Sequence, residues 1–258
     1  MVELEPALLA RRAAGERAFV PYVTGGLPGV DAALLRALEG AGADAVEVGV
    51  PFSDPVMDGG VIQEASRIAL ERGARPGDVL DTVAEAGLHV PVVLMTYLNP
   101  VLRRGEAAFV AAAAHSGVSG IIVPDLPVDE AEVWVARCAE ASVAPVFLAA
   151  PGSSEDRLRA IANASRGFVY CVSTYGVTGE RDRLAGTARE VVAALRPLTD
   201  RPLLVGVGIG SPDQAAEACR FADGVVVGSA IVRHLLAGER DRAIELAAAF
   251  RSATRAVE

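Results

Sequence analysis

The chain has 258 residues, 52% of them hydrophobic, and is therefore long enough to bury one large core. Its formal net charge of −9 argues against nucleic acid as the main partner, because phosphate backbones are bound by clustered Lys and Arg. The three cysteines are widely spaced and form no CxxC pair, which indicates buried free thiols rather than a zinc ribbon or a disulfide framework. The N-terminus lacks the pattern of a secretory signal and no apolar run approaches about 18 residues, so we expect a soluble, cytoplasmic protein without a membrane segment.

One unit recurs along the chain: a short apolar run, a turn with Gly, Pro or Asp, and an amphipathic segment rich in Ala, Leu, Glu and Arg. A first helix is predicted at residues 5–16, ahead of the repeating pattern. Strands are predicted at 19–24, 45–50, 92–97, 120–125, 144–150, 167–173, 201–208 and 223–229. Helices are predicted at 30–43, 106–117, 129–142, 154–165, 187–198, 211–222 and 239–257.

The predicted strands are apolar along nearly their whole length, which is typical of parallel strands that are covered on both faces. Strand and helix alternate eight times, and this predicts a (β/α)8 TIM barrel as a single domain over residues 1–258. The extra helix at 5–16 is expected to close the bottom of the barrel. An open doubly wound sheet is the alternative, but eight near-equal units without a break in composition favour closure. Functional residues are then expected at the C-terminal ends of the strands.

The second predicted strand, VEVGV, carries a carboxylate in its middle, Glu47. No Lys or Arg occurs between Arg36 and Arg67, so Glu47 has no partner nearby in sequence. Burial without a partner raises the pKa of a carboxyl group and suits it to general acid–base catalysis. Asp54 and Asp58 follow in a loop of prolines and glycines, where either acid taken alone is more readily a turn former than a functional group. Together with Glu47, this loop indicates acid–base chemistry at the mouth of the barrel.

Glycine-rich turns follow the last three predicted strands, at 176–179, 206–210 and 228–230. Loops after the seventh and eighth strands of barrels often bind phosphate through backbone N–H groups, and the hydroxyl of Ser229 adds a donor. The alternative is that these glycines only close tight turns. The segment GVGIGS lacks the GxGxxG spacing of a dinucleotide site. The histidines lack ligand spacing, so we expect no metal site.

Eight segments closely resemble the tryptophan synthase α chains. They are VPYVT (20–24), EVGVPFSDP (47–55), DG (58–59), MTYLNP (95–100), PDLP (124–127), GVTG (176–179), GVGI (206–209) and GSAIV (228–232). The resemblance is collinear from about residue 19 to residue 236. It implies a (β/α)8 barrel that cleaves indole-3-glycerol phosphate to indole and glyceraldehyde 3-phosphate without a cofactor. It also implies a pyridoxal-phosphate β subunit as partner, in an α2β2 assembly, with the loop from Pro51 to Asp58 in the docking surface.

The resemblance assigns roles to individual residues. Glu47 corresponds to the family's catalytic glutamate, which protonates the indole ring and takes the proton of the glycerol hydroxyl. Asp58 corresponds to the aspartate that binds the indole N–H, and Tyr170 to a tyrosine that assists both acids. The phosphate is expected on Gly179, Gly208, Gly228 and Ser229. The indole pocket and its loops are expected to include Tyr22, Tyr97, Ile122, Thr178, Val207 and Val226.

The sequence departs from the family pattern at Leu27, Met57, Gly60 and Tyr175, mostly in loops that close the site or face the β subunit. Two alternatives therefore stay open. One is a free-standing indole-3-glycerol phosphate lyase that supplies indole to a specialised pathway. The other is a catalytically weak subunit that activates a partner. A phosphosugar isomerase barrel is a remoter possibility, because only the predicted phosphate-binding loops support it.

Overall fold

The strands form one parallel sheet that curls into a barrel. The computed structural model describes residues 2–172, 181–206 and 208–255, and only the backbone of residues 181–185. The sheet order is β5-β4-β3-β2-β1-β9-β8-β7-β6, and the paired strands run parallel. The strands are β1 (Ala18–Thr24), β2 (Val46–Gly49), β3 (Val92–Met95), β4 (Val118–Ile122), β5 (Ala144–Val146), β6 (Leu148–Ala149), β7 (Val169–Val172), β8 (Leu203–Gly206) and β9 (Gly224–Val227).

The barrel closes within the fifth predicted strand, 144–150, which the structure divides into β5 and β6. β5 pairs with β4 and β6 pairs with β7, so one segment joins the two edges of the sheet. The division falls at Phe147, whose backbone N–H donates to the side chain of Ser165 at 3.3 Å instead of to a strand. The prediction of an α/β TIM barrel is thus confirmed, with the difference that its fifth strand is interrupted.

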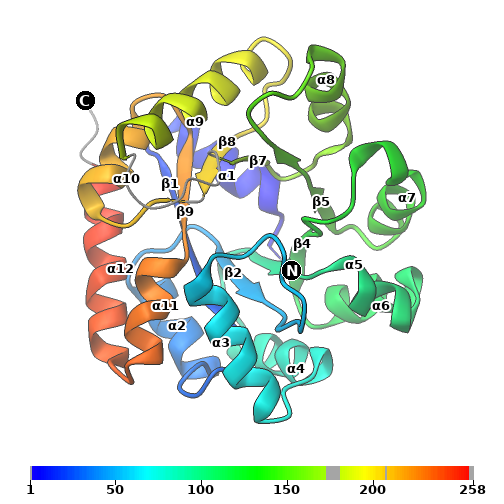
Figure 1. Cartoon of the computed structure of the whole chain (residues 1–258), viewed down its shortest axis with the longest axis vertical. Coiled ribbons are helices and arrows are strands. Elements are labelled where there is room, and N and C mark those ends of the chain that lie inside the picture. The colour runs from blue at the N-terminus through cyan, green and yellow to red at the C-terminus, as the bar shows by residue number, and fades with distance from the viewer. Residues whose placement is uncertain (1, 173–180, 207, 256–258) are drawn as a thin grey trace.

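Helices surround the strands (Figure 1). They are α1 (Leu4–Ala13), α2 (Ala32–Gly40), α3 (Gly60–Glu71), α4 (Pro76–Ala86), α5 (Leu98–Arg104), α6 (Glu106–His115), α7 (Glu132–Glu140), α8 (Glu155–Ala164), α9 (Arg181–Leu195), α10 (Pro212–Cys219), α11 (Ser229–Leu236) and α12 (Arg240–Arg255), with a 3-10 turn, η1 (Val128–Glu130). Four of them, α3, α4, α5 and α11, lie outside the predicted helical segments. Within the described part of the chain, none of the helices is both long and apolar enough to cross a membrane.

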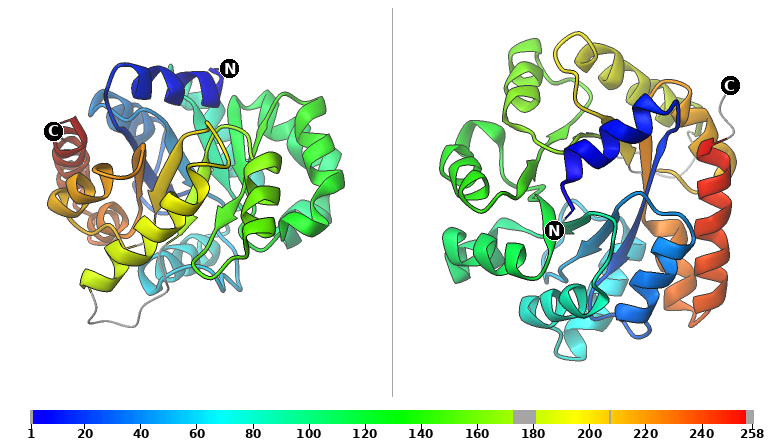
Figure 2. Two further views of the ribbon diagram at one scale, coloured as in Figure 1. Left: turned by 90° about the horizontal axis from the view of Figure 1, so that it is seen from above. Right: turned by 180° about the vertical axis from the view of Figure 1, so that it is seen from behind.

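The extra helix α1 lies across the N-terminal end of the barrel, as predicted (Figure 2, right). Leu4 and Leu8 are each only 2% exposed, so α1 contributes to the core. A Cβ atom at Gly120 or Gly167 would come within 2.7 Å and 2.5 Å, respectively, of the Leu4 side chain. These glycines therefore make room for the apolar face of α1.

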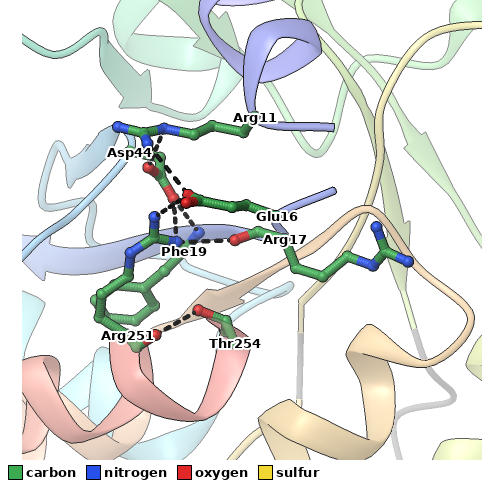
Figure 3. Close-up of polar contacts among 7 residues, drawn as sticks. All are labelled: Arg11, Glu16, Arg17, Phe19, Asp44, Arg251 and Thr254. Carbon is green, nitrogen blue, oxygen red and sulfur yellow. Dashed lines mark hydrogen bonds and ion pairs between the residues drawn. The ribbon is translucent and has the colours of Figure 1, made fainter. Parts of the chain in front are cut away.

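A cluster of charges, in which Asp44 and Arg251 are buried, holds both ends of the chain to this side of the barrel (Figure 3). Asp44, just before β2, accepts a hydrogen bond from Phe19 N at 2.9 Å and pairs with Arg11 of α1 at 2.8 Å and with Arg251 of α12 at 2.9 Å. Arg251 also pairs with Glu16 at 2.8 Å. Burial raises the pKa of Asp44 although both arginines oppose the shift. The cluster lies at the end of the barrel opposite the expected site, so its role is structural.

Candidate active site

A cavity of about 590 Å³ opens at the C-terminal ends of the strands. Its wall contains most of the described residues that the sequence analysis assigned to the site: Tyr22, Glu47, Asp58, Ile122, Tyr170, Gly208, Val226, Gly228 and Ser229. It also contains Met57, Gly59, Ile62, Met95, Pro124, Leu148, Val172, Ile209, Gly210, Ala230 and Arg233. The cavity is mostly apolar, with two carboxyl groups at one place and glycine-rich turns at another, which is the usual composition of a small-molecule site.

Glu47 projects from β2 into this cavity. It is in register with Tyr22 on β1 and Val93 on β3, and only 4% of it is exposed. The atom Oε2 is buried and has no hydrogen-bond partner in the described structure, so the carboxyl group is held in an apolar wall with one oxygen unsatisfied. Burial, with a smaller contribution from the charge of Asp58, raises the pKa of Glu47 to about 8. A carboxyl group in this state can hold and release a proton near neutral pH.

Asp58 comes from the loop between β2 and α3. Its backbone N–H donates to Pro55 O at 3.0 Å, and its carbonyl accepts from the Gln63 side chain at 2.8 Å, so local bonds shape the end of the loop. Burial raises the pKa of Asp58 to about 6, and a hydrogen bond from the Tyr97 hydroxyl opposes part of this rise. Asp54, in contrast, is exposed and accepts a hydrogen bond from its neighbour Ser53, as a turn-forming acid does.

Tyr97 lies behind the loop that carries Asp58 rather than in the cavity wall. It caps the N-terminus of α5 just after β3 ends, and only 1% of it is exposed. Its hydroxyl accepts from Met57 N at 3.0 Å, and its ring stacks on Phe52 with centroids 5.1 Å apart. Tyr97 therefore supports the loop. The sequence analysis named it in one group with the indole pocket and its loops and did not say to which of the two it belongs.

The glycine-rich side of the cavity is built by the turns after β8 and β9. Gly208 has φ of +86°, a conformation that favours glycine. Gly228 precedes α11, which begins at Ser229, so the first N–H groups of this helix lie at the cavity wall. Helix N-termini of this kind bind anions. Arg233, one turn further along α11, also lines the cavity.

Arg233 is the clearest functional candidate that the sequence analysis missed. Side chains in a helix lean toward its N-terminus, so Arg233 covers the turn that begins with Ser229. It is exposed and makes no ion pair with the described residues. It is the one cation in the described wall, which also holds the acids Glu47 and Asp58. Its spacing of four residues from Ser229 in a helix was the signal available in the sequence.

Some expected residues cannot be compared with the structure. Thr178, Gly179 and Val207 lie outside the described residues, as does Tyr175. Of the other departures, Leu27 is buried in the core, Met57 lines the cavity and Gly60 is the first residue of α3. In the described ranges, no three His, Cys, Asp or Glu side chains are grouped so that they could hold a metal ion.

Comparison with known proteins connects this geometry to one family. The chain matches the family described as tryptophan synthase alpha chain over residues 8–257. A tryptophan synthase alpha chain of Streptomyces avermitilis is 45% identical over 244 residues, which cover 93% of this chain and 88% of the relative. A solved structure of Mycobacterium tuberculosis tryptophan synthase has a TM-score of 0.90 at 42% identity, covering 98% of both chains. Tryptophan synthase subunit alpha from Legionella pneumophila has a TM-score of 0.90 at 30% identity, again covering 98% of both chains.

Proposed function

This chain belongs to the tryptophan synthase alpha chain family, and from that premise we propose how its cavity performs the family's lyase reaction. The substrate is indole-3-glycerol phosphate, and the products are indole and glyceraldehyde 3-phosphate. The observation that carries the proposal is the pairing of Glu47 and Asp58 in one cavity with a glycine-rich anion site. A phosphosugar isomerase would also use an anion site, but it would have no need for the apolar wall that an indole ring fills.

Glu47 moves the protons in this mechanism. Its raised pKa, about 8, keeps the carboxyl group protonated at neutral pH. It gives this proton to ring carbon C3 of the indole, and its carboxylate then accepts the proton of the glycerol hydroxyl at the neighbouring carbon. As the aldehyde forms, the electrons of the carbon–carbon bond return to the ring and indole departs. One proton leaves Glu47 and one returns, so the group is ready for the next turnover.

Asp58 stabilises the positive charge that the ring acquires. Protonation at C3 makes the indole N–H electron-poor, and an ionised carboxylate that accepts this N–H lowers the barrier. With a pKa of about 6, Asp58 is mostly ionised at neutral pH while Glu47 is not. Because their surroundings give the two acids different pKa values, Glu47 can donate a proton while Asp58 acts as an anion. Tyr170, which also lines the cavity, assists them.

The phosphate end of the substrate lies on the turns after β8 and β9. Backbone N–H groups at Gly208, Gly228 and Ser229 bind its oxygens, and the expectation for Gly179 extends this set. Arg233 adds a full positive charge beside them. Binding at this remote end positions the scissile bond between the two acids.

The indole ring lies against apolar residues in the opposite part of the cavity. Tyr22, Ile122 and Val226 line the cavity and would contact the ring. Val207 and Thr178 complete the expected indole pocket. Thr178 follows β7 in the sequence, and we propose from the family resemblance that its segment closes over the substrate and helps to place Asp58. Exclusion of water strengthens the interaction of both acids with the ring.

A pyridoxal-phosphate β subunit is the partner that we propose for this chain, in an α2β2 assembly that receives the indole. Two large apolar side chains are exposed near the site: Val56, which is 78% exposed, and Leu102, which is 58% exposed. The loop with Val56 and helix α5 with Leu102 are joined by the hydrogen bond from Met57 N to Tyr97. A partner that covers these side chains would press on the loop that carries Asp58. Our proposal places the pyridoxal phosphate on the partner alone and the chain in the cytoplasm.

An indole-release assay of the purified chain, with and without a β subunit, tests the proposal. We expect slow release by the chain alone and faster release when the β subunit is added. Full activity without a partner would instead support the free-standing lyase, and no indole under either condition would overturn the lyase mechanism. The shared name of the relatives favours the α-subunit role over both the free-standing lyase and the activating subunit.

A further inference from the structure

Tyr22 has an unusual position on the inner face of the barrel. It is in register with Glu47 on the neighbouring strand, and Thr24 is in register with Gly49. The side chain of Tyr22 extends past Glu47 toward the C-terminal end of the strands. Its hydroxyl occupies the place of the missing side chain of Gly49, because a Cβ atom there would lie 2.1 Å from Tyr22 Oη. The hydroxyl therefore lies one layer nearer to the cavity mouth than the backbone position of Glu47.

The same arrangement occurs once more in the barrel. Tyr170 on β7 is in register with Leu204 on β8, and Val172 with Gly206. A Cβ atom at Gly206 would lie 2.0 Å from Tyr170 Oη. Tyr170 and Tyr22 thus each extend over a glycine two residues further along the next strand, and both line the cavity. The repeated pattern indicates that each glycine admits a hydroxyl group and not only a ring.

The hydroxyl of Tyr22 is available as a hydrogen-bond donor. Only 6% of the residue is exposed, and Thr24 Oγ1 donates to Tyr22 Oη at 3.4 Å, which leaves the proton of Tyr22 free to point into the cavity. Burial first, and then the negative charge of Asp58, raise the pKa of Tyr22 well above its usual value, so the proton stays on the oxygen. Glu47 contributes in the same direction, so both acids lie close enough to act on this group.

We infer that the Tyr22 hydroxyl contacts the substrate: it donates to the glycerol hydroxyl beside the scissile bond and holds that hydroxyl against the carboxyl group of Glu47. This rests on the proposed function, and it adds a polar role to a residue that would otherwise be only an apolar wall of the pocket. The carboxyl group of Glu47 is the second half of the arrangement: it lines the same cavity, and its buried Oε2 has no hydrogen-bond partner in the described structure. A substrate hydroxyl between the two groups would satisfy both.

The experiment compares the wild-type chain with Tyr22→Phe, which keeps the ring over Gly49 and removes only the oxygen. For each we would measure indole release from indole-3-glycerol phosphate and the Kd of 3-(indol-3-yl)propyl phosphate, an analogue that lacks both glycerol hydroxyls. We expect kcat/KM to fall by about 100- to 1,000-fold, the usual cost of one donor to a reacting oxygen, with the Kd of the analogue unchanged within about twofold.

A second variant keeps the inference testable by another route. Gly49→Ala should displace the hydroxyl and reproduce the selective loss of turnover. Gly77→Ala in α4, where a Cβ atom would meet nothing within 4 Å, is the matched control and should retain wild-type activity. Equal turnover of wild type and Tyr22→Phe would overturn the inference, as would a parallel loss of analogue binding, which would indicate that only the shape of the ring matters. A wild-type chain that releases no indole would instead overturn the proposed function.

Discussion

The hydroxyl of Tyr97 accepts a hydrogen bond from the backbone N–H of Met57 at 3.0 Å, and it donates one to the carboxylate of the next residue, Asp58. One side chain at the start of α5 thereby holds two consecutive residues of the loop after β2. Because Tyr97 is almost fully buried and stacked on Phe52, its hydroxyl is a fixed point for the loop. The position and the charge of Asp58 therefore depend on a residue from the neighbouring strand–helix unit.

Tyr97→Phe tests this dependence through the pH profile. In the wild type we expect a bell-shaped kcat/KM, which rises as Asp58 ionises near its pKa of about 6 and falls as Glu47 ionises near its pKa of about 8. The hydrogen bond from Tyr97 lowers the pKa of Asp58, so its loss should move the acid limb to higher pH, by roughly half a unit or more. Phe52→Leu, which keeps the hydroxyl, is the control. An acid limb that stays in place in Tyr97→Phe would contradict the proposed contact.

Glu47→Gln should abolish indole release, by about a thousandfold or more, because the amide cannot transfer the proton. It should also change the pH dependence of stability. The pKa of Glu47 in the folded chain, about 8, is above its unfolded value of 4.5, so the contribution of this group is complete below pH 4.5 and is lost as the pH rises toward 8. The glutamine variant lacks this loss and should be more stable than wild type at pH 8, by on the order of 4 kcal/mol.

Denaturant unfolding at pH 5 and pH 8 measures this effect, since the difference between variant and wild type should grow with pH. Glu64→Gln serves as a surface control, because Glu64 is an exposed partner of Arg67 and should show no such growth. If the free energy of unfolding of the glutamine variant exceeds that of wild type by the same amount at both pH values, Glu47 is not protonated in the folded chain at neutral pH.

Arg233→Gln should weaken substrate binding more than it slows the chemical step. Arg233 is one helical turn after Ser229 in α11, next to the glycine-rich turn after β9, so we expect KM to rise about tenfold with kcat nearly unchanged. Inhibition by inorganic phosphate should weaken in parallel. Arg242→Gln, at an exposed arginine paired with Glu239, is the matched control. If the two variants show the same KM, Arg233 does not contribute to phosphate binding.

Arg251→Met should destabilise the chain without changing the site. It leaves the buried carboxylate of Asp44 without one of its two arginine partners, and breaking a buried pair in this way costs about 3 kcal/mol. Arg67→Met breaks exposed pairs and should cost less than about 1 kcal/mol. Free energies of unfolding from denaturant titration test both values, and the folded variant should keep its kcat because the cluster lies at the other end of the barrel. A cost for Arg251→Met no larger than that for Arg67→Met would contradict the structural role.

Much of this protein could be predicted from local pattern. Apolar runs that alternate with amphipathic segments indicated the eight strand positions, because parallel strands covered on both faces must be apolar throughout. Glu47 was identified because a carboxylate within such a run must face either the barrel interior or a buried partner. The turns with Gly208 and Gly228 were identified because a backbone that approaches an anion needs residues without side chains. Each of these signals lies within a few residues of sequence.

The remaining features depend on contacts between units that are distant in the sequence. Nothing in the local sequence around Tyr97 shows that its hydroxyl reaches Met57, which is 40 residues away. The closure of the barrel at Phe147 was likewise set by packing. So was the position of Tyr22 over Gly49, which only strand register decides. The sequence by itself indicated the two acids, Glu47 and Asp58, and the glycine-rich turns as candidates for the site. The tertiary structure decided which oxygen lies beside which, because hydrogen bonds act over about 3 Å and sequence spacing does not specify such distances between strands.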